Sequence, residues 1–138
     1  MENQKKFKIA FASDDSNEAV LKAKEYIKNN HELIEIKSDN WVEMSVNIAN
    51  LVSNGDVDFG VIMCWTGTGT AIAANKQKGI RAATVIDSWT AKGARMWNDA
   101  NIITMSLKRL SPDIVVECID TFVNTSPDDN ERDNINLL

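Results

Sequence analysis

The sequence is poor in the residues that build metal centres and covalent cross-links. Its 138 residues include one histidine and two cysteines, and these do not fall in the spacings of zinc sites or disulfide-stapled domains. We therefore expect no bound metal ion and no disulfide framework. A single histidine also leaves few candidates for imidazole acid–base chemistry.

Long apolar runs and basic clusters are also missing. No apolar run approaches the roughly 20 residues that a membrane-spanning helix needs. The basic residues 5–8 precede a short strand pattern rather than the apolar segment of a signal peptide. The net charge is −5, and no basic stripe is present that would favour nucleic acid. These absences predict a soluble cytoplasmic protein with no membrane or nucleic-acid partner.

What the chain does contain is a regular alternation of strand and helix patterns. Its length of 138 residues suits one domain, in which residues from about 126 to 138 form a tail or a short docking segment. Strand patterns cover residues 7–12, 33–36, 57–64, 80–86 and 102–105. Helical patterns cover residues 18–30, 41–53, about 71–78, 89–98 and 111–122. The alternation predicts a Rossmann-like α/β fold, with a five-stranded parallel sheet between two helical layers.

Ligands of such sheets bind at the carboxyl ends of the strands. A glycine-rich turn, residues 64–70, follows the third strand pattern and leads into an alanine-rich helix. Free N–H groups at a helix start suit a phosphate or a developing oxyanion. Ile72 stands where a dinucleotide-binding fingerprint has its third glycine, and no Gly-Lys-Ser/Thr of a P-loop follows. An anion site and a turn that merely allows close packing both remain open.

Cys64 lies where the strand pattern meets this turn. A helix start favours the thiolate form, which makes Cys64 a candidate base or nucleophile. The other interpretation is a buried structural cysteine, which is the common state of a free thiol and the one we expect for Cys118. A cysteine-dependent hydrolase has little support, because we expect His31 at the surface and far from Cys64.

Two carboxylates, Asp14 and Asp15, follow the first strand pattern. At the carboxyl edge of the sheet they suit acid–base work or the binding of sugar hydroxyls. Capping of the next helix is an equally good explanation for one of them.

The segments together resemble the ribose-5-phosphate isomerase type B family, which includes the galactose-6-phosphate isomerase subunits. The resemblance runs from Lys8 to about Val123. The family pattern Cys-Gly-Thr-Gly-x-Gly, then Ile-Ala-Ala-Asn-Lys, then Gly-Ile-Arg-Ala-Ala is matched by residues 64–69, 72–76 and 79–83. Residues 98–101, Asn-Asp-Ala-Asn, match a further family motif.

This resemblance implies an enzyme that interconverts aldose and ketose sugar phosphates through a cis-enediolate without a cofactor. Cys64 stands where many members carry the catalytic base, and Thr66 matches the threonine of the catalytic loop. Asn98 matches an asparagine that contacts the substrate. The backbone that would stabilise the enediolate belongs to Gly67, Thr68, Gly69 and Thr70.

The departures from the family pattern fall on the half of the site that opens the ring and holds the phosphate. Asp15 and Trp97 stand where the family has histidines, and Lys108 aligns with an arginine. An arginine-rich C-terminal motif is reduced to Arg132. Trp65 and Thr70 replace small or apolar loop residues. With Asp14, these positions complete the expected substrate site.

The first hypothesis is therefore an isomerase of a sugar or sugar phosphate that keeps Cys64 as its base. Its substrate is either the usual one, or an open-chain or unphosphorylated sugar, or one whose ring is opened by Asp14. The alternative is a non-catalytic or partner-dependent subunit that binds a sugar phosphate. The resemblance implies a homodimer or tetramer, or pairing with a homologous subunit.

Overall fold

The computed structural model describes residues 5–138, and its secondary structure alternates strand and helix. The strands are β1 (Lys8–Ser13), β2 (Glu32–Glu35), β3 (Phe59–Cys64), β4 (Ala82–Thr84) and β5 (Ile102–Ser106). The helices are α1 (Glu18–Asn30), α2 (Trp41–Ser53), α3 (Thr68–Asn75), α4 (Ser88–Asn98), α5 (Pro112–Val123) and α6 (Arg132–Ile135), with a 3₁₀ turn, η1 (Asp129–Glu131), before the last.

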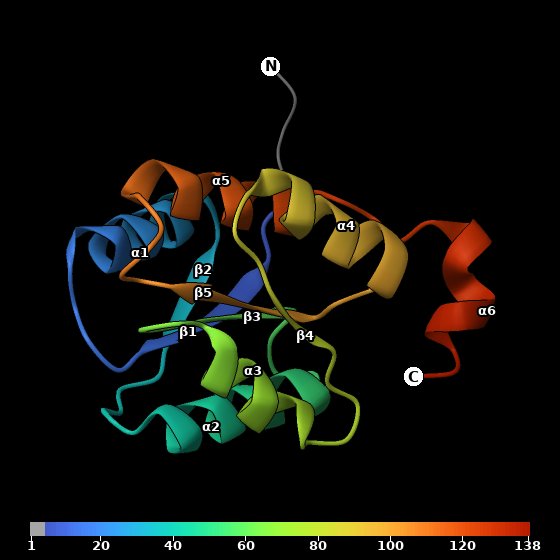
Figure 1. The fold of residues 1–138 in the computed structure, drawn as a ribbon, viewed down its shortest axis with the longest axis horizontal. Coiled ribbons are helices and arrows are strands. Elements are labelled where there is room, and N and C mark those ends of the chain that lie inside the picture. The colour runs from blue at the N-terminus through green and yellow to red at the C-terminus, as the bar shows by residue number, and fades with distance from the viewer. Residues whose placement is uncertain (1–4) are drawn as a thin grey trace.

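All five strands are parallel and lie in the order β2-β1-β3-β5-β4. Helices α1, α4 and α5 cover one face of the sheet, and α2 and α3 cover the other (Figure 1). The expected three-layer α/β/α fold is therefore confirmed. The central position of β3 places its carboxyl end, at Cys64, between the ends of β1 and β5.

Alternation along the strands divides the core into two parts. Ile9 and Phe11 belong to the cluster beneath α1, α4 and α5, whereas Ala10 and Ala12 belong to the cluster beneath α2 and α3, as the two-residue repeat of a strand requires. Cys64 belongs to the second cluster. Its side chain therefore lies on the face that α3 covers.

The fourth strand and the helix before it are shorter than the sequence pattern predicts. Helix α3 ends at Asn75 rather than near residue 78, and β4 spans only Ala82–Thr84. The Asn75 side chain accepts a hydrogen bond from the Ala82 N–H at 2.8 Å and donates one to the Ala82 carbonyl at 2.9 Å. This side chain takes the place of a neighbouring strand at the edge of the sheet, and the chain reverses between Asn75 and Ala82 through Gly79, whose φ is +83°.

The segment from 126 to 138 lies beside the end of α4 (Figure 1). The Asp128 N–H donates to the Met96 carbonyl at 2.8 Å, and the Arg132 guanidinium lies 3.5 Å from the Asp99 carboxylate. No helix among residues 5–138 combines the length and the apolarity needed to cross a membrane.

The expectation of a surface position for His31 is wrong, because its side chain is only 5% exposed. The Phe7 N–H donates to His31 Nδ1 at 3.1 Å, and the Phe7 ring packs beside the imidazole. Burial lowers the pKa of His31, so the ring is neutral near pH 7. It lies between the end of α1 and the start of β2, at the sheet edge opposite Cys64. It therefore serves folding rather than catalysis at that thiol.

Candidate functional site

The turn after β3 is shaped by one residue with a left-handed backbone. Gly67 has φ +79° and forms the N-cap of α3. A Cβ at this position would lie 3.0 Å from the Met105 carbonyl carbon, which is tighter than nearly all real Cβ contacts. The turn therefore needs glycine both for its conformation and for its contact with β5.

Three threonine hydroxyls, two of them from buried residues, hold the Gly67 carbonyl. Thr104 donates to it at 2.6 Å, Thr84 at 3.0 Å and Thr70 at 3.3 Å. Thr84 of β4 and Thr104 of β5 thus hold the glycine turn from the sheet. Thr70 holds it from the start of α3. Thr84 and Thr104 are support residues that sequence reasoning missed. Their only signal in the sequence is a threonine within each of two largely apolar strand patterns.

Cys64 is held in place by the same turn. Its side chain is 6% exposed, and its Sγ accepts the Gly67 N–H at 3.1 Å and lies 3.4 Å from Thr70 Oγ1. It lines a cavity of about 350 Å³ whose other lining residues are Asp14, Trp41, Trp65, Thr66, Thr68 and Gly69. The structure therefore brings the thiol, the glycine turn, Thr66 and Asp14 to one cavity.

Asp14 is the acidic group of this cavity. Its Oδ1 is buried and has no hydrogen-bond partner among the described residues. Burial raises the pKa of Asp14, and the neighbouring Asp15 charge adds to that effect. Asp14 therefore keeps its proton to a higher pH than an ordinary aspartate, which suits a group that donates a proton to a ligand.

Asp15 points instead toward Trp65 and Lys108. The Trp65 Nε1–H donates to Asp15 Oδ2 at 3.2 Å, and Lys108 Nζ lies 3.9 Å from the same oxygen and 4.5 Å from the Trp65 ring centre. The Ser16 N–H, followed by Trp65 and then Lys108, lowers the pKa of Asp15, so this carboxylate is ionised. Lys108, expected to face a phosphate, faces an acid here.

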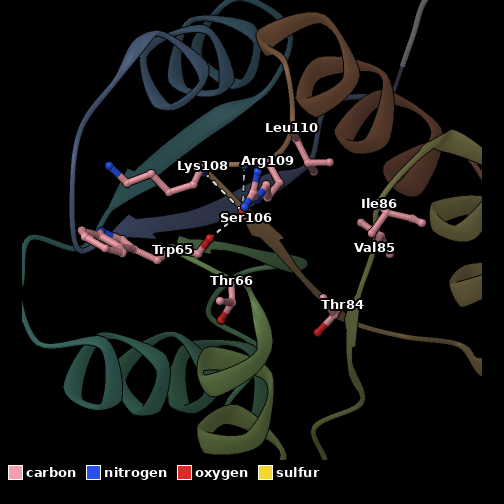
Figure 2. A pocket seen from close by; sticks show the side chains of 9 residues that line it. All are labelled: Trp65, Thr66, Thr84, Val85, Ile86, Ser106, Lys108, Arg109 and Leu110. Atoms are coloured by element: carbon pink, nitrogen blue, oxygen red, sulfur yellow. Dashed lines mark hydrogen bonds between the residues drawn. The ribbon is translucent and has the colours of Figure 1, made fainter.

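A second cavity of about 590 Å³ lies on the other side of Trp65, which lines both cavities together with Thr66. Figure 2 shows Trp65 and Lys108 on one side of it and Thr84, Val85 and Ile86 of the β4 region on the other. The Ser106 hydroxyl donates to the Trp65 carbonyl at 2.5 Å and accepts the N–H groups of Lys108 and Arg109. It therefore ties the turn after β5 to the turn after β3.

A family model described as Ribose/Galactose Isomerase matches residues 9–137. The chain belongs to this family. It is 45% identical to ribose-5-P isomerase B of Listeria innocua over 85 residues, which cover 62% of this chain and 57% of that protein. It is 36% identical to galactose-6-phosphate isomerase subunit LacB of Clostridium acetobutylicum over 109 residues, which cover 75% and 63% respectively. The chain thus spans less than two thirds of the length of these relatives.

Solved structures of the ribose/galactose isomerase family superpose over nearly the whole chain. A ribose 5-phosphate isomerase of Thermotoga maritima gives a TM-score of 0.87 at 29% identity and covers 95% of this chain and 96% of that chain. The type B ribose 5-phosphate isomerase of Trypanosoma brucei gives 0.86 at 27% identity, covering 96% and 97%. The turn at Cys64 thus lies in a fold that this chain shares with these isomerases.

Three residues expected from the family pattern are not among those that line the Cys64 cavity. Trp97 packs on Gly93 and against Trp89, with ring centres 5.9 Å apart. Asn98 lines other cavities. Arg132 joins Arg81 and Arg95 around the Asp99 carboxylate. All three gather at the carboxyl end of α4 and the segment docked beside it.

Proposed function

We propose that this protein is an aldose–ketose isomerase of sugar phosphates that works through a cis-enediolate with Cys64 as the base. The observation that carries the proposal is the position of Cys64 Sγ, 3.1 Å from the Gly67 N–H in a cavity at the start of α3. Family membership supports the same chemistry. The related proteins named above are ribose-5-phosphate and galactose-6-phosphate isomerases.

The proton transfer follows from the geometry of the turn. The Cys64 thiolate removes the proton from C2 of the open-chain aldose, and the negative charge moves to the carbonyl oxygen on C1. The first N–H groups of α3 lack intrahelical partners and stabilise that oxygen. The proton of the C2 hydroxyl moves to the oxygen on C1, the C2–O bond becomes the carbonyl, and the thiol returns its proton to C1. The sum is an isomerisation with no net redox change and no external reductant.

The test is a panel of substrates followed by NMR in deuterated water. Ribose 5-phosphate, galactose 6-phosphate, erythrulose 4-phosphate and free ribose are each incubated with the purified chain. We expect isomerisation of at least one phosphorylated sugar, with solvent deuterium entering at the carbon next to the carbonyl. If none of these sugars is isomerised and none exchanges deuterium with the solvent, the enzymatic proposal is refuted.

The second candidate is a partner-dependent subunit. The lining of the Cys64 cavity does not include Trp97, Asn98 or Arg132 of the same chain, and one relative is named as a subunit, LacB. In a homodimer, a second copy would bring these three residues to the Cys64 cavity. In a mixed assembly, a homologous subunit would do so. Activity that appears only when a homologous subunit is added would favour the mixed assembly over the homodimer.

We further propose that Asp14 opens the sugar ring, since Trp97 stands where the family has a histidine for that step. Asp14→Asn is expected to lower kcat/KM for ribose 5-phosphate about 100-fold, because positioned acids contribute at least that much. Erythrulose 4-phosphate is the control. It has no free hydroxyl that can close a furanose ring and needs no ring opening, so its turnover should change little. An equal loss on both substrates would show that Asp14 does something other than open rings.

A further inference from the structure

Among the described residues, Thr70 carries the one hydroxyl that reaches both the candidate base and the carbonyl of the turn. Its side chain is fully buried, with Oγ1 3.4 Å from Cys64 Sγ and 3.3 Å from the Gly67 carbonyl oxygen. A hydroxyl has a single hydrogen and can donate to only one of these acceptors at a time. The direction of that donation depends on whether Cys64 carries its own proton.

With Cys64 as a thiol, the S–H donates to Thr70 Oγ1, and the Thr70 hydroxyl donates to the Gly67 carbonyl. With Cys64 as a thiolate, the sulfur needs donors, and the Gly67 N–H at 3.1 Å already supplies one. The Thr70 hydroxyl supplies a second when its O–H rotates about the Cβ–Oγ1 bond, with the oxygen staying in place. No other described side chain has a hydrogen bond to this sulfur.

The rotation leaves no buried acceptor unsatisfied. The Gly67 carbonyl still receives Thr104 at 2.6 Å and Thr84 at 3.0 Å after Thr70 turns away. An unpaired buried carbonyl would otherwise penalise the thiolate state. Because Thr84 and Thr104 keep donating to the Gly67 carbonyl, that carbonyl is hydrogen-bonded whether Cys64 is a thiol or a thiolate.

From this geometry we infer that Thr70 is a positioning residue whose hydroxyl follows the proton of Cys64 and stabilises its thiolate. The inference rests on the proposed role of Cys64 as the base. It also gives a chemical use to one of the two loop positions where the family has small or apolar residues. Asp14 is the only other ionisable side chain that lines the same cavity, and the core cluster around Cys64 is otherwise apolar.

The test is the pH profile of Cys64 alkylation by iodoacetamide, read by peptide mass spectrometry between pH 6 and 10. Thr70→Val removes the hydroxyl and keeps the shape of the side chain. We expect its alkylation midpoint to rise by about one pH unit, with about tenfold slower reaction near neutral pH, because a hydrogen bond to a charged group is lost. Thr70→Ser, which keeps the hydroxyl, is expected to retain the wild-type profile.

Thr84→Val is the matched control. It removes a hydroxyl from the same Gly67 carbonyl but does not touch the sulfur, so its midpoint is expected to stay at the wild-type value. An unchanged midpoint in Thr70→Val, or an equal rise in Thr84→Val, overturns the inference. Thr70→Ala serves as a second variant in case valine disturbs folding, which thermal unfolding reports.

Alkylation separates this inference from the proposed function. If the wild-type chain isomerises no sugar, the profile still measures whether Thr70 stabilises the thiolate. If the wild type isomerises but Thr70→Val leaves the profile unchanged, the inference about Thr70 falls alone. If both proposals hold, kcat of Thr70→Val falls about tenfold near neutral pH and recovers toward the wild-type value at alkaline pH. The KM should change little, since the hydroxyl does not face the sugar.

Discussion

Replacing Cys64 with serine is expected to lower kcat by a factor of about 10² to 10⁴, the usual contribution of a positioned base. A serine hydroxyl is far harder to deprotonate than a thiol at neutral pH. Serine still presents an acceptor to the Gly67 N–H, which Cys64 Sγ now accepts at 3.1 Å. The turn is therefore expected to keep its shape, and the loss should appear in kcat rather than in KM. Deuterium exchange into the substrate should fall by the same factor.

The control is the other thiol, Cys118. It lies in the core cluster on the opposite face of the sheet and is fully buried. Burial raises the pKa of Cys118 to about 12, so it carries no thiolate near neutral pH. Cys118→Ala is expected to lower stability through the cavity it leaves, with an unchanged kcat. A Cys64→Ser protein that retains more than about a tenth of the activity would exclude Cys64 as the base.

The fold followed from the sequence because strand and helix patterns alternate without interruption. Helices α1 and α2 begin and end where the patterns predict, because capping residues such as Asn17 and Asn40 mark their starts. The end of α3 did not follow, because the side chain of Asn75, the last residue of the helix, pairs with the backbone of Ala82, seven residues farther along. A local pattern carries no trace of that contact.

His31 shows the same limit more sharply. Its polar neighbours in the sequence favour the surface, yet the chain places it under Phe7, 24 residues away, where its Nδ1 serves as an acceptor for a backbone N–H. Such a buried partner is set by the pairing of β1 with β2, which a single sequence does not specify residue by residue.

The candidate site also has a part that follows from neighbouring residues in the sequence and a part that depends on distant contacts. The part within one turn, from Cys64 to Thr70, was predictable because adjacent residues supply the thiol, the glycine and the helix start. Thr84 and Thr104 were missed because they reach that turn only through the sheet. The contact between Asp15, Trp65 and Lys108 joins three separate loops. Lys108, the expected phosphate ligand, is therefore paired with Asp15 instead.

This ion pair bears on how the proposed substrate would be held. Asp15 and Lys108 are both about half exposed, and an exposed pair of this kind contributes little stability. A phosphate is a stronger partner for Lys108 than a single carboxylate with a 3.9 Å separation. Binding of a phosphorylated sugar therefore requires Lys108 to turn from Asp15, or Arg109, which lines the neighbouring cavity, to take the phosphate.

The turn itself is the second place where one substitution should have a large effect. Gly67→Ala is expected to lower the free energy of unfolding by about 1–3 kcal/mol, the cost of holding a non-glycine residue in a strained backbone region. The φ angle of Gly67 is +79°, and the Cβ of an alanine there would press on the Met105 carbonyl carbon. Any shift moves the N–H groups that we propose stabilise the enediolate oxygen, so kcat should fall at least about 100-fold. Thermal unfolding and the isomerase assay measure the two effects separately.

Gly55→Ala separates the cost of the backbone from the cost of the contact. Gly55 has nearly the same φ, +78°, but a Cβ there meets nothing within 4 Å, and it lies in the loop after α2, away from the Cys64 cavity. This variant is expected to lose about 1 kcal/mol of stability and to keep wild-type turnover. If Gly67→Ala loses no more stability and no more activity than Gly55→Ala, the contact with β5 does not hold the turn in its active shape. The catalytic role of the N–H groups would then have to be assigned elsewhere.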